Sequence, residues 1–247
     1  MSIQSEFELE QLRIAGQIVR RALNAMSAAV APGVTTAELD TVCERVLTED
    51  GATSAPRKVY AFPGAACISV NDEVVHGVPG PRTLQTGDLV KLDVTVEKNG
   101  FYADAAVTVR VGEVSEQADA LARCAESAFR KAMKVARTGY RVYEIGRAVE
   151  REVRGHGFSV LREYCGHGIG RTIHEQPTVP NYLDLNNRAR LTDGLVLAVE
   201  PIIAAGGWRS TVDGDGWTVR TADHSLAAHY EHTVVITRGE PILITAA

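Results

Sequence analysis

The sequence is poor in features that mark several common classes of protein. Only four of its 247 residues are cysteine and they form no C-x-x-C pair, so neither a disulfide framework nor a zinc ribbon is expected. We predict four free thiols in a reducing compartment. Neither a G-x-G-x-x-G motif nor a P-loop occurs, so a hydride-transfer or phosphate-binding enzyme has no support.

Positive charge is also scarce. The 26 Lys and Arg residues are outnumbered by 31 Asp and Glu residues, which gives a formal net charge of −5. This balance argues against a DNA-binding protein, which needs a basic face for phosphate. No apolar run reaches the roughly 18 residues of a membrane span, and the acidic start, MSIQSEFELEQL, has no apolar signal core. We therefore expect a cytoplasmic protein that makes no membrane contact.

The hydrophobic pattern predicts helices and strands in alternating blocks. Apolar side chains recur at helical spacing from about Glu6 to Val30, and Thr35 with Glu38 forms a capping box for a second helix ending near Glu49. A β-rich stretch follows, with a hairpin signal at Asn99-Gly100. The remaining expected elements are helices at 115–136 and 143–154 and strands at 159–164, 195–203, 217–221 and 232–237.

Two segments of the chain repeat each other. The stretch APGVTTAELDTVCERVLTEDG, which ends at Gly51, resembles ARTGYRVYEIGRAVEREVRGHG, which ends at Gly157. The spacing from Gly33 to Gly51 equals that from Gly139 to Gly157. For the helices alone, chance similarity is as good an explanation. The strands that follow them make a repeat the better one, because acidic residues recur at corresponding places.

Each half of the sequence contains two acidic residues at the ends of predicted strands. Asp93 closes the run TGDLVKLD and Glu200 closes TDGLVLAVE, whereas Asp104 opens DAAVTVRVG and Glu231 opens EHTVVITRG. An acid at the end of an apolar strand is expected to face the interior, where its charge is costly unless it is paired or binds a metal. Four converging acids without matching Lys or Arg therefore indicate divalent cations as the neutralising charge.

Three histidines complete the pattern. His167 and His174 lie in CGHGIGRTIHE, a spacing that suits a loop or a pair of strands, and His76 lies beside a turn in VVHGVP. One imidazole with four carboxylates favours Mn, Fe, Co or Zn, ideally two ions sharing bridging carboxylates. Such a pair activates water and polarises a carbonyl, while two further histidines would orient substrate and stabilise an oxyanion.

The motifs together resemble one enzyme family. VNDEVVHGVP, LDVTVEKNGFYADAAVT, REYCGHGIGRTIHEQP, VEPII, DGWTVRT and AAHYEHTVVIT are similar to a type I methionine aminopeptidase of the compact bacterial form. The resemblance covers nearly the whole chain. It implies an α+β pita-bread fold, with helices packed on an antiparallel-rich central sheet. We expect one catalytic domain over residues 1–247, with halves of about 1–112 and 113–247 and the metals between them.

The resemblance also implies the metal ligands. Asp93 would bind one of two divalent ions, Co, Mn, Fe or Zn, and Asp104 and Glu231 would bridge both. His167 and Glu200 would bind the other ion. The reaction would be hydrolysis of the first peptide bond of a nascent protein, releasing methionine when the second residue is small.

Substrate contacts follow from the same resemblance. His174 would contact the scissile carbonyl, His76 would contact the substrate backbone and assist proton transfer, and Glu200 would handle the proton of the attacking water. The methionine pocket would be lined by Phe62, Cys67 and Trp217. The expected partner is the N-terminal peptide of a nascent protein, with the ribosome as a further candidate, and the expected state is a monomer.

Departures from the family pattern lie near the methionine pocket. The segment Lys58-Val59-Tyr60-Ala61-Phe62-Pro63 stands where the family has a sequence like GYxGFP. The other departures are Ile173 in place of an aromatic residue, Ile202 in place of methionine and His229 in place of glutamine. The pocket stays apolar but changes shape, so an altered preference at this pocket is one expectation. Two alternatives remain: a pita-bread peptidase of another specificity, such as an Xaa-Pro aminopeptidase, and an inactive binding homologue.

Overall fold

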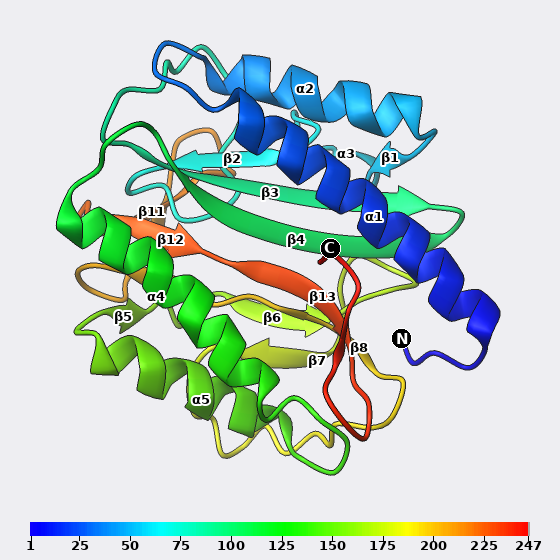
Figure 1. Cartoon of the computed structure of the whole chain (residues 1–247). Coiled ribbons are helices and arrows are strands. Elements are labelled where there is room, and N and C mark those ends of the chain that lie inside the picture. The colour runs from blue at the N-terminus through cyan, green and yellow to red at the C-terminus, as the bar shows by residue number, and fades with distance from the viewer. Residues whose placement is uncertain (247) are drawn as a thin grey trace.

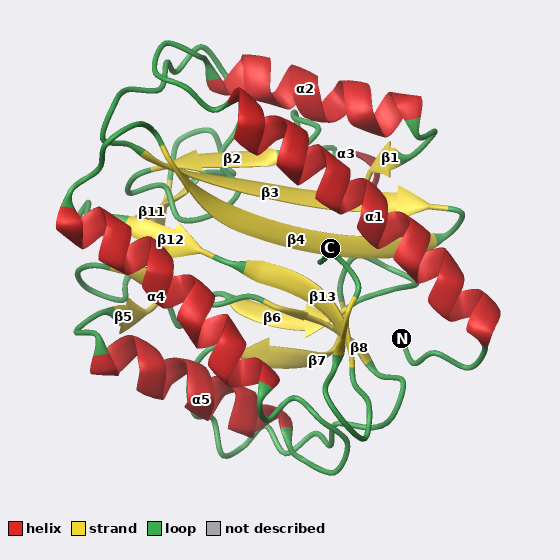
Figure 2. Cartoon of the chain, in the orientation of Figure 1, coloured by secondary structure: helices red, strands yellow, loops and turns green. Residues whose placement is uncertain are grey.

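The computed structural model describes residues 1–246, which form five helices and fourteen strands within that range (Figures 1 and 2). The helices are α1 (Glu6–Ala29), α2 (Thr36–Glu49), α3 (Ala55–Tyr60), α4 (Glu116–Met133) and α5 (Val142–Gly155). The strands of the first half are β1 (Thr53–Ser54), β2 (Cys67–Val70), β3 (Leu89–Lys98) and β4 (Phe101–Arg110). The strands of the second half are β5 (Ser159–Val160), β6 (Cys165–Gly168), β7 (Glu175–Pro180), β8 (Val196–Val199), β9 (Ile202–Ala204), β10 (Ser210–Val212), β11 (Val219–Thr221), β12 (Ala227–His229), β13 (Glu231–Val235) and β14 (Ile242–Leu243).

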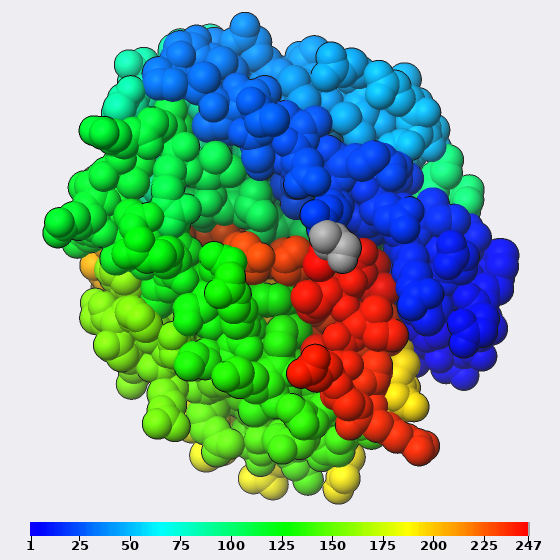
Figure 3. Space-filling view, viewed as in Figure 1, coloured from blue at the N-terminus to red at the C-terminus, as the bar shows by residue number. Residues whose placement is uncertain are grey.

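One sheet runs through both halves of the molecule. Its strand order is β1-β3-β4-β13-β8-β6-β7, and β2 and β14 pair with β3 and β13. The seam between the halves is the antiparallel pairing of β4 with β13, where Glu231 lies opposite Ala106. Helix α1 packs against β3 and β4, and α4 packs against β12, β9 and β4. The C-terminal residues, red in Figure 3, lie between α1 and α4 on the helical face.

The predicted repeat is present in the backbone. Helices α2 and α5 are each 14 residues long, and each follows a longer helix that it packs against. All four glycines of the repeat, Gly33, Gly51, Gly139 and Gly157, have positive φ. Glycine adopts this conformation without the steric cost that a Cβ imposes. The equal glycine spacing therefore marks two helices that begin and end with the same backbone turns.

Most predicted elements are confirmed, with differences at short elements. The capping box at Thr35 and Glu38 forms, and Asn99-Gly100 joins β3 to β4. The predicted strand at 159–164 is limited to Ser159–Val160, and a separate strand begins at Cys165. Helix α3 was not predicted, because six residues are too few to display a helical period. None of the helices formed by residues 1–246 has the length and apolar character that a bilayer crossing requires.

Close packing of α5 on β7 provides a test of this arrangement. A Cβ at Gly146 would lie 2.1 Å from the Tyr182 carbonyl oxygen and 2.5 Å from that of Pro180. Because backbone atoms cannot yield as a flexible side chain does, we expect Gly146→Ala to lower the free energy of unfolding by about 1–3 kcal/mol. Gly155→Ala, in the same helix with open space around it, should change it by no more than about 1 kcal/mol. Urea unfolding of both variants measures the difference, and equal stabilities would contradict the packing.

Candidate active site

Strand register brings three acidic side chains to one face of the sheet. Across β3 and β4, Asp93 lies opposite Ala106 and Thr95 lies opposite Asp104, and across the seam Glu231 also lies opposite Ala106. Because side chains alternate between faces, Asp93, Asp104 and Glu231 all project from the face that Ala106 shares. The small side chain of Ala106 leaves room between the carboxylates of the two halves.

His167 reaches the same face from the other side of the seam. It lies opposite Ala198 on β8, which in turn lies opposite Thr233, two residues along β13 from Glu231. Its Nδ1 is 2.9 Å from the Gly168 carbonyl oxygen, which only accepts hydrogen bonds. Nδ1 therefore carries the proton, and Nε2 is left with a free lone pair 3.7 Å from Oε1 of Glu200. This is the arrangement of a histidine ready to bind a metal ion.

Two threonines fasten the seam beside the carboxylates. Thr233 Oγ1 accepts from the Asp104 N–H and donates to the Asp104 carbonyl oxygen, both at 2.8 Å. Thr108 Oγ1 makes the reciprocal pair with the backbone of His229, at 2.9 and 2.8 Å. One threonine hydroxyl from each half thus binds the backbone of a residue at the site in the other half. The relative position of Asp104 and Glu231 depends on these bonds.

Burial makes the negative charge at this site costly. It raises the pKa of all four predicted carboxyl ligands, and it raises the pKa of Asp104, Glu200 and Glu231 well above their usual values. Repulsion from neighbouring carboxylates raises the pKa of these three further. Such a cluster is stable at neutral pH only with protons or cations among the oxygens.

The donor atoms fit a divalent cation. Asp104 Oδ1 and Glu231 Oε1 are buried without a hydrogen-bond partner, although buried polar atoms are normally satisfied. Ligand atoms of Asp104, His167 and Glu231 lie within 4.8 Å of one another, and so do those of Glu200, His229 and Glu231. Carboxylate and imidazole donors in this number suit Mn, Fe, Co or Zn. The residues present therefore fit one or more such ions.

His229 is a member of this cluster that the sequence did not assign to the metal site. Its Nε2 lies 3.5 Å from Glu200 Oε2 and 3.6 Å from Glu231 Oε2, and neither ring nitrogen has a hydrogen-bond partner. Burial lowers the pKa of His229 to about 4, so the ring is neutral at pH 7. Only its position one residue before Tyr230-Glu231, where it departs from the family pattern, could have drawn attention to it.

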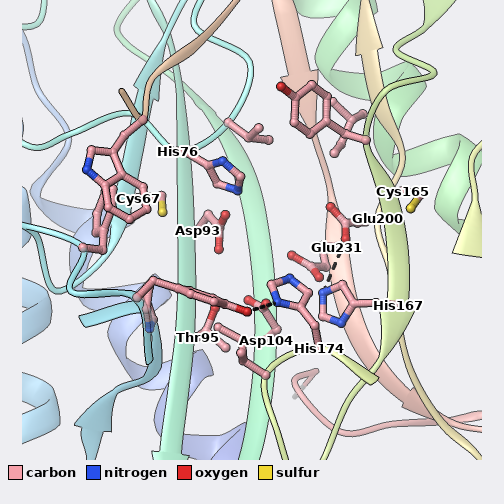
Figure 4. Close-up of a pocket in the computed structure, with 18 residues that line it drawn as sticks. Cys67, His76, Asp93, Thr95, Asp104, Cys165, His167, His174, Glu200 and Glu231 are labelled. Carbon is pink, nitrogen blue, oxygen red and sulfur yellow. Dashed lines mark hydrogen bonds and ion pairs between the residues drawn. The ribbon is translucent and has the colours of Figure 1, made fainter. Parts of the chain in front are cut away.

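The other two histidines lie beside the carboxylates on irregular backbone (Figure 4). His76 has φ of 57°, a left-handed conformation that is unusual for a residue with a Cβ and common at functional sites. The rings of His174 and His167 are 4.2 Å apart, centroid to centroid. Burial lowers the pKa of both His76 and His174, so both rings are neutral at pH 7. Neutral imidazoles offer one donor and one acceptor to a substrate.

All ten predicted site residues line one cavity of about 340 Å³. They are Phe62, Cys67, His76, Asp93, Asp104, His167, His174, Glu200, Trp217 and Glu231. Phe62 and Trp217 pack edge to face with centroids 5.3 Å apart and form an apolar wall. Burial raises the pKa of Cys67 well above its usual value, so its thiol stays protonated and contributes apolar surface.

Several lining residues had no assigned role in the sequence. They include Tyr60, Thr95, Tyr164 and Cys165. Ile173 and Ile202 line the cavity, as the family comparison suggested. Val59, expected at the pocket, is instead 45 % exposed and absent from the lining. Successive side chains of a helix point in different directions. Tyr60 therefore faces the cavity, whereas its neighbour Val59 does not.

Comparison with known proteins gives full-length matches. The model of metallopeptidase family M24 matches residues 10–238. The chain is 45 % identical to methionine aminopeptidase 2 of Bacillus subtilis, over 99 % of both chains. It is 39 % identical to methionine aminopeptidase of Escherichia coli, over 96 % of this chain and 90 % of that one.

Solved structures agree. The crystal structure of methionine aminopeptidase from Thermotoga maritima matches with a TM-score of 0.97 and 36 % identity over the whole of both chains. Prolidase from Pyrococcus horikoshii matches with a TM-score of 0.79 at 21 % identity, over 99 % of this chain and 63 % of that one. The second likeness shows a shared fold alone.

The crowded carboxylates generate a prediction about metal and pH. Adding Mn(II) or Co(II) to chelator-treated protein should raise Tm by about 5–10 °C at saturating metal, because the ion binds the folded state only. Since the raised carboxyl pKa values make protons compete with the ion, the shift should shrink as pH falls from about 7.5 to about 5. Differential scanning calorimetry at both pH values measures it.

Matched variants sharpen this test. Asp104→Asn should abolish the metal-induced shift, because it removes a carboxylate from the centre of the cluster. Asp193→Asn, at an exposed aspartate outside the cavity lining, should leave the shift unchanged. A Tm that does not respond to metal at either pH would contradict the assignment of this cluster.

Proposed function

The chain belongs to metallopeptidase family M24, among its methionine aminopeptidases, and we propose how its residues remove an N-terminal methionine. The family resemblance, the hydrolase activity and the pita-bread fold predicted from the sequence are confirmed by the full-length relatives. The observation that carries the proposal is the convergence of four carboxylates and His167 beside an apolar cavity. That arrangement supplies both a metal site and a place for the methionine side chain.

For the metal site we propose two divalent ions. Asp93 would hold one ion, Asp104 and Glu231 would hold both, and His167 with Glu200 would hold the other. The free lone pair of His167 and the unpartnered carboxylate oxygens support this assignment. When bound, such ions lower the pKa of water and polarise a carbonyl group.

The proton steps fall to side chains beside that site. Glu200 lines the cavity beside the other carboxylates and would accept the proton of the attacking water. Burial and the charge of Asp93 raise its pKa, which makes it a stronger base than an exposed carboxylate. His174 is neutral and would donate a hydrogen bond to the carbonyl oxygen as negative charge develops there. His76 would contact the substrate backbone. Two backbone hydrogen bonds hold the turn that carries His76. The Ile68 N–H donates to the Gly77 carbonyl oxygen, and the Val219 N–H donates to the Val75 carbonyl oxygen.

Specificity would come from the apolar wall. Phe62, Cys67 and Trp217 would surround the methionine side chain, and its flexible thioether adapts to the shape that Ile173 and Ile202 give the cavity. The second residue of the substrate would be small. We further propose that residues 1–247 act as one catalytic unit with halves 1–112 and 113–247, as a monomer in the cytoplasm, on nascent chains at or near the ribosome.

Peptide cleavage tests this proposal. Metal-stripped protein would be assayed with and without Mn(II) or Co(II) on Met-Ala-Ser, Leu-Ala-Ser and Ala-Pro-Ser. Metal-dependent release of methionine is expected, because the apolar cavity wall suits its long, flexible side chain. Release of leucine as well would mean a relaxed pocket. Cleavage only before proline, or metal binding without cleavage of any peptide, would overturn the proposal in favour of a related peptidase or a binding role.

The role of His174 is tested separately. His174→Ala should retain bound metal but lose about 10²–10³-fold in kcat, as expected for a lost oxyanion donor. Metal content by elemental analysis and kcat on Met-Ala-Ser give the two readings. As a control, His156→Ala changes an exposed histidine that caps the C-terminus of α5 and lies outside the cavity lining, and it should leave both readings unchanged. Full turnover in His174→Ala would remove His174 from the mechanism.

A further inference from the structure

Tyr60 makes a hydrogen bond across the cavity. Its hydroxyl oxygen lies 2.6 Å from Nδ1 of His174, and the two rings are 5.7 Å apart, centroid to centroid. The dashed line that ends at His174 in Figure 4 marks this bond. Tyr60 belongs to α3 in the first half of the chain, whereas His174 immediately precedes β7 in the second half. The bond therefore joins the two sides of the cavity at a residue that would act on the substrate.

The tautomer of His174 depends on what Nδ1 bonds. A neutral imidazole has one protonated nitrogen, and the hydrogen bond made by one nitrogen sets the state of the other. If the Tyr60 hydroxyl donates to Nδ1, then Nε2 carries the proton and is the donor. A carbonyl oxygen that gains negative charge needs a donor, so only this tautomer serves the substrate.

We propose that Tyr60 is a positioning residue that holds His174 with its Nε2 protonated and its ring oriented for the substrate carbonyl. This inference rests on the proposed function, and specifically on His174 as the donor to the substrate. Tyr60 itself acts through His174 and transfers no proton to or from the substrate.

The local structure holds Tyr60 in place for this task. It is the last residue of α3, and Ala61 ends the helix in a left-handed conformation with φ of 58°. Two ion pairs tie α3 to its neighbours, Arg57 with Glu44 and Lys58 with Glu97, the latter at 2.8 Å. Phe62, two residues on, is buried against Trp217. A hydroxyl on such a fixed backbone is better preorganised than one on a free loop.

The tautomer is measured without metal or substrate. Protein labelled with ¹⁵N-histidine would be studied by long-range proton–nitrogen correlation NMR, with His174→Gln identifying the His174 signals. The wild type should show His174 protonated at Nε2. Tyr60→Phe keeps the ring and removes the hydroxyl, so the Nδ1-protonated form should become populated. A wild-type His174 protonated at Nδ1, or a tautomer unchanged in Tyr60→Phe, would overturn the proposal.

Kinetics give the second reading. Metal-loaded Tyr60→Phe should lose about 10- to 100-fold in kcat on Met-Ala-Ser with little change in KM, because a small misplacement of a catalytic group has this effect. Tyr140→Phe removes the hydroxyl of an exposed tyrosine outside the cavity and should leave kcat unchanged. In the His174→Gln background, Tyr60→Phe should cost nothing further, because the two residues act as one unit. A kcat for Tyr60→Phe equal to that of the wild type would refute the positioning role.

Failure of the two proposals can be told apart. If the wild type cleaves no methionyl peptide, the proposed function fails, and the NMR result still decides whether Tyr60 sets the tautomer of His174. If the wild type is active while Tyr60→Phe changes neither tautomer nor kcat, only the role of Tyr60 fails.

Discussion

Repulsion among four buried carboxylates, three on one face of the central sheet and Glu200 directly after β8, is the constraint on which the rest of this structure depends. Desolvation and mutual repulsion raise their pKa values, so the folded state needs compensating positive charge at that point. The nearby imidazoles cannot supply it, because burial lowers the pKa of His167 and His229 to about 4 and keeps them neutral. A site that is negative, buried and surrounded by neutral nitrogen donors is one that a divalent cation stabilises.

The pairing of β4 with β13 fixes where carboxylates from the two halves lie relative to each other. Asp104 comes from one half and Glu231 from the other, and the Thr233 and Thr108 hydroxyls bind backbone across the seam on either side of Ala106. In a sheet, a slip of one residue in register moves every side chain to the opposite face. The seam hydrogen bonds therefore protect the arrangement of the carboxylates as well as the fold. A repeated architecture suits this site, because each half delivers its acids on rigid strands.

Strands and loops have different tasks around the cavity. Strands hold Asp93, Asp104, Glu231 and His167, and Glu200 directly follows β8. These residues must keep their mutual distances. Three further cavity-lining residues lie on turns and a short helix: His76 in a left-handed turn, His174 before β7 and Tyr60 at the end of α3. Loops and helix ends allow such residues to reach the cavity from both halves. The bond between Tyr60 and His174 links the two groups of elements, so the orientation of a histidine in one half depends on a hydroxyl in the other.

The sequence by itself indicated four of the five described helices, the internal repeat and ten residues that line the cavity. Helical periods, capping signals and glycine spacing are local properties, and the acids Asp93, Asp104, Glu200 and Glu231 stood out because charge is costly at the ends of apolar strands. The tertiary structure alone decided which side chains meet: His229 beside Glu200 and Glu231, and Tyr60 rather than Val59 at the cavity. These contacts join residues far apart in the chain. They depend on strand register and on the direction in which α3 presents each side chain, and neither leaves a periodic signal in the sequence.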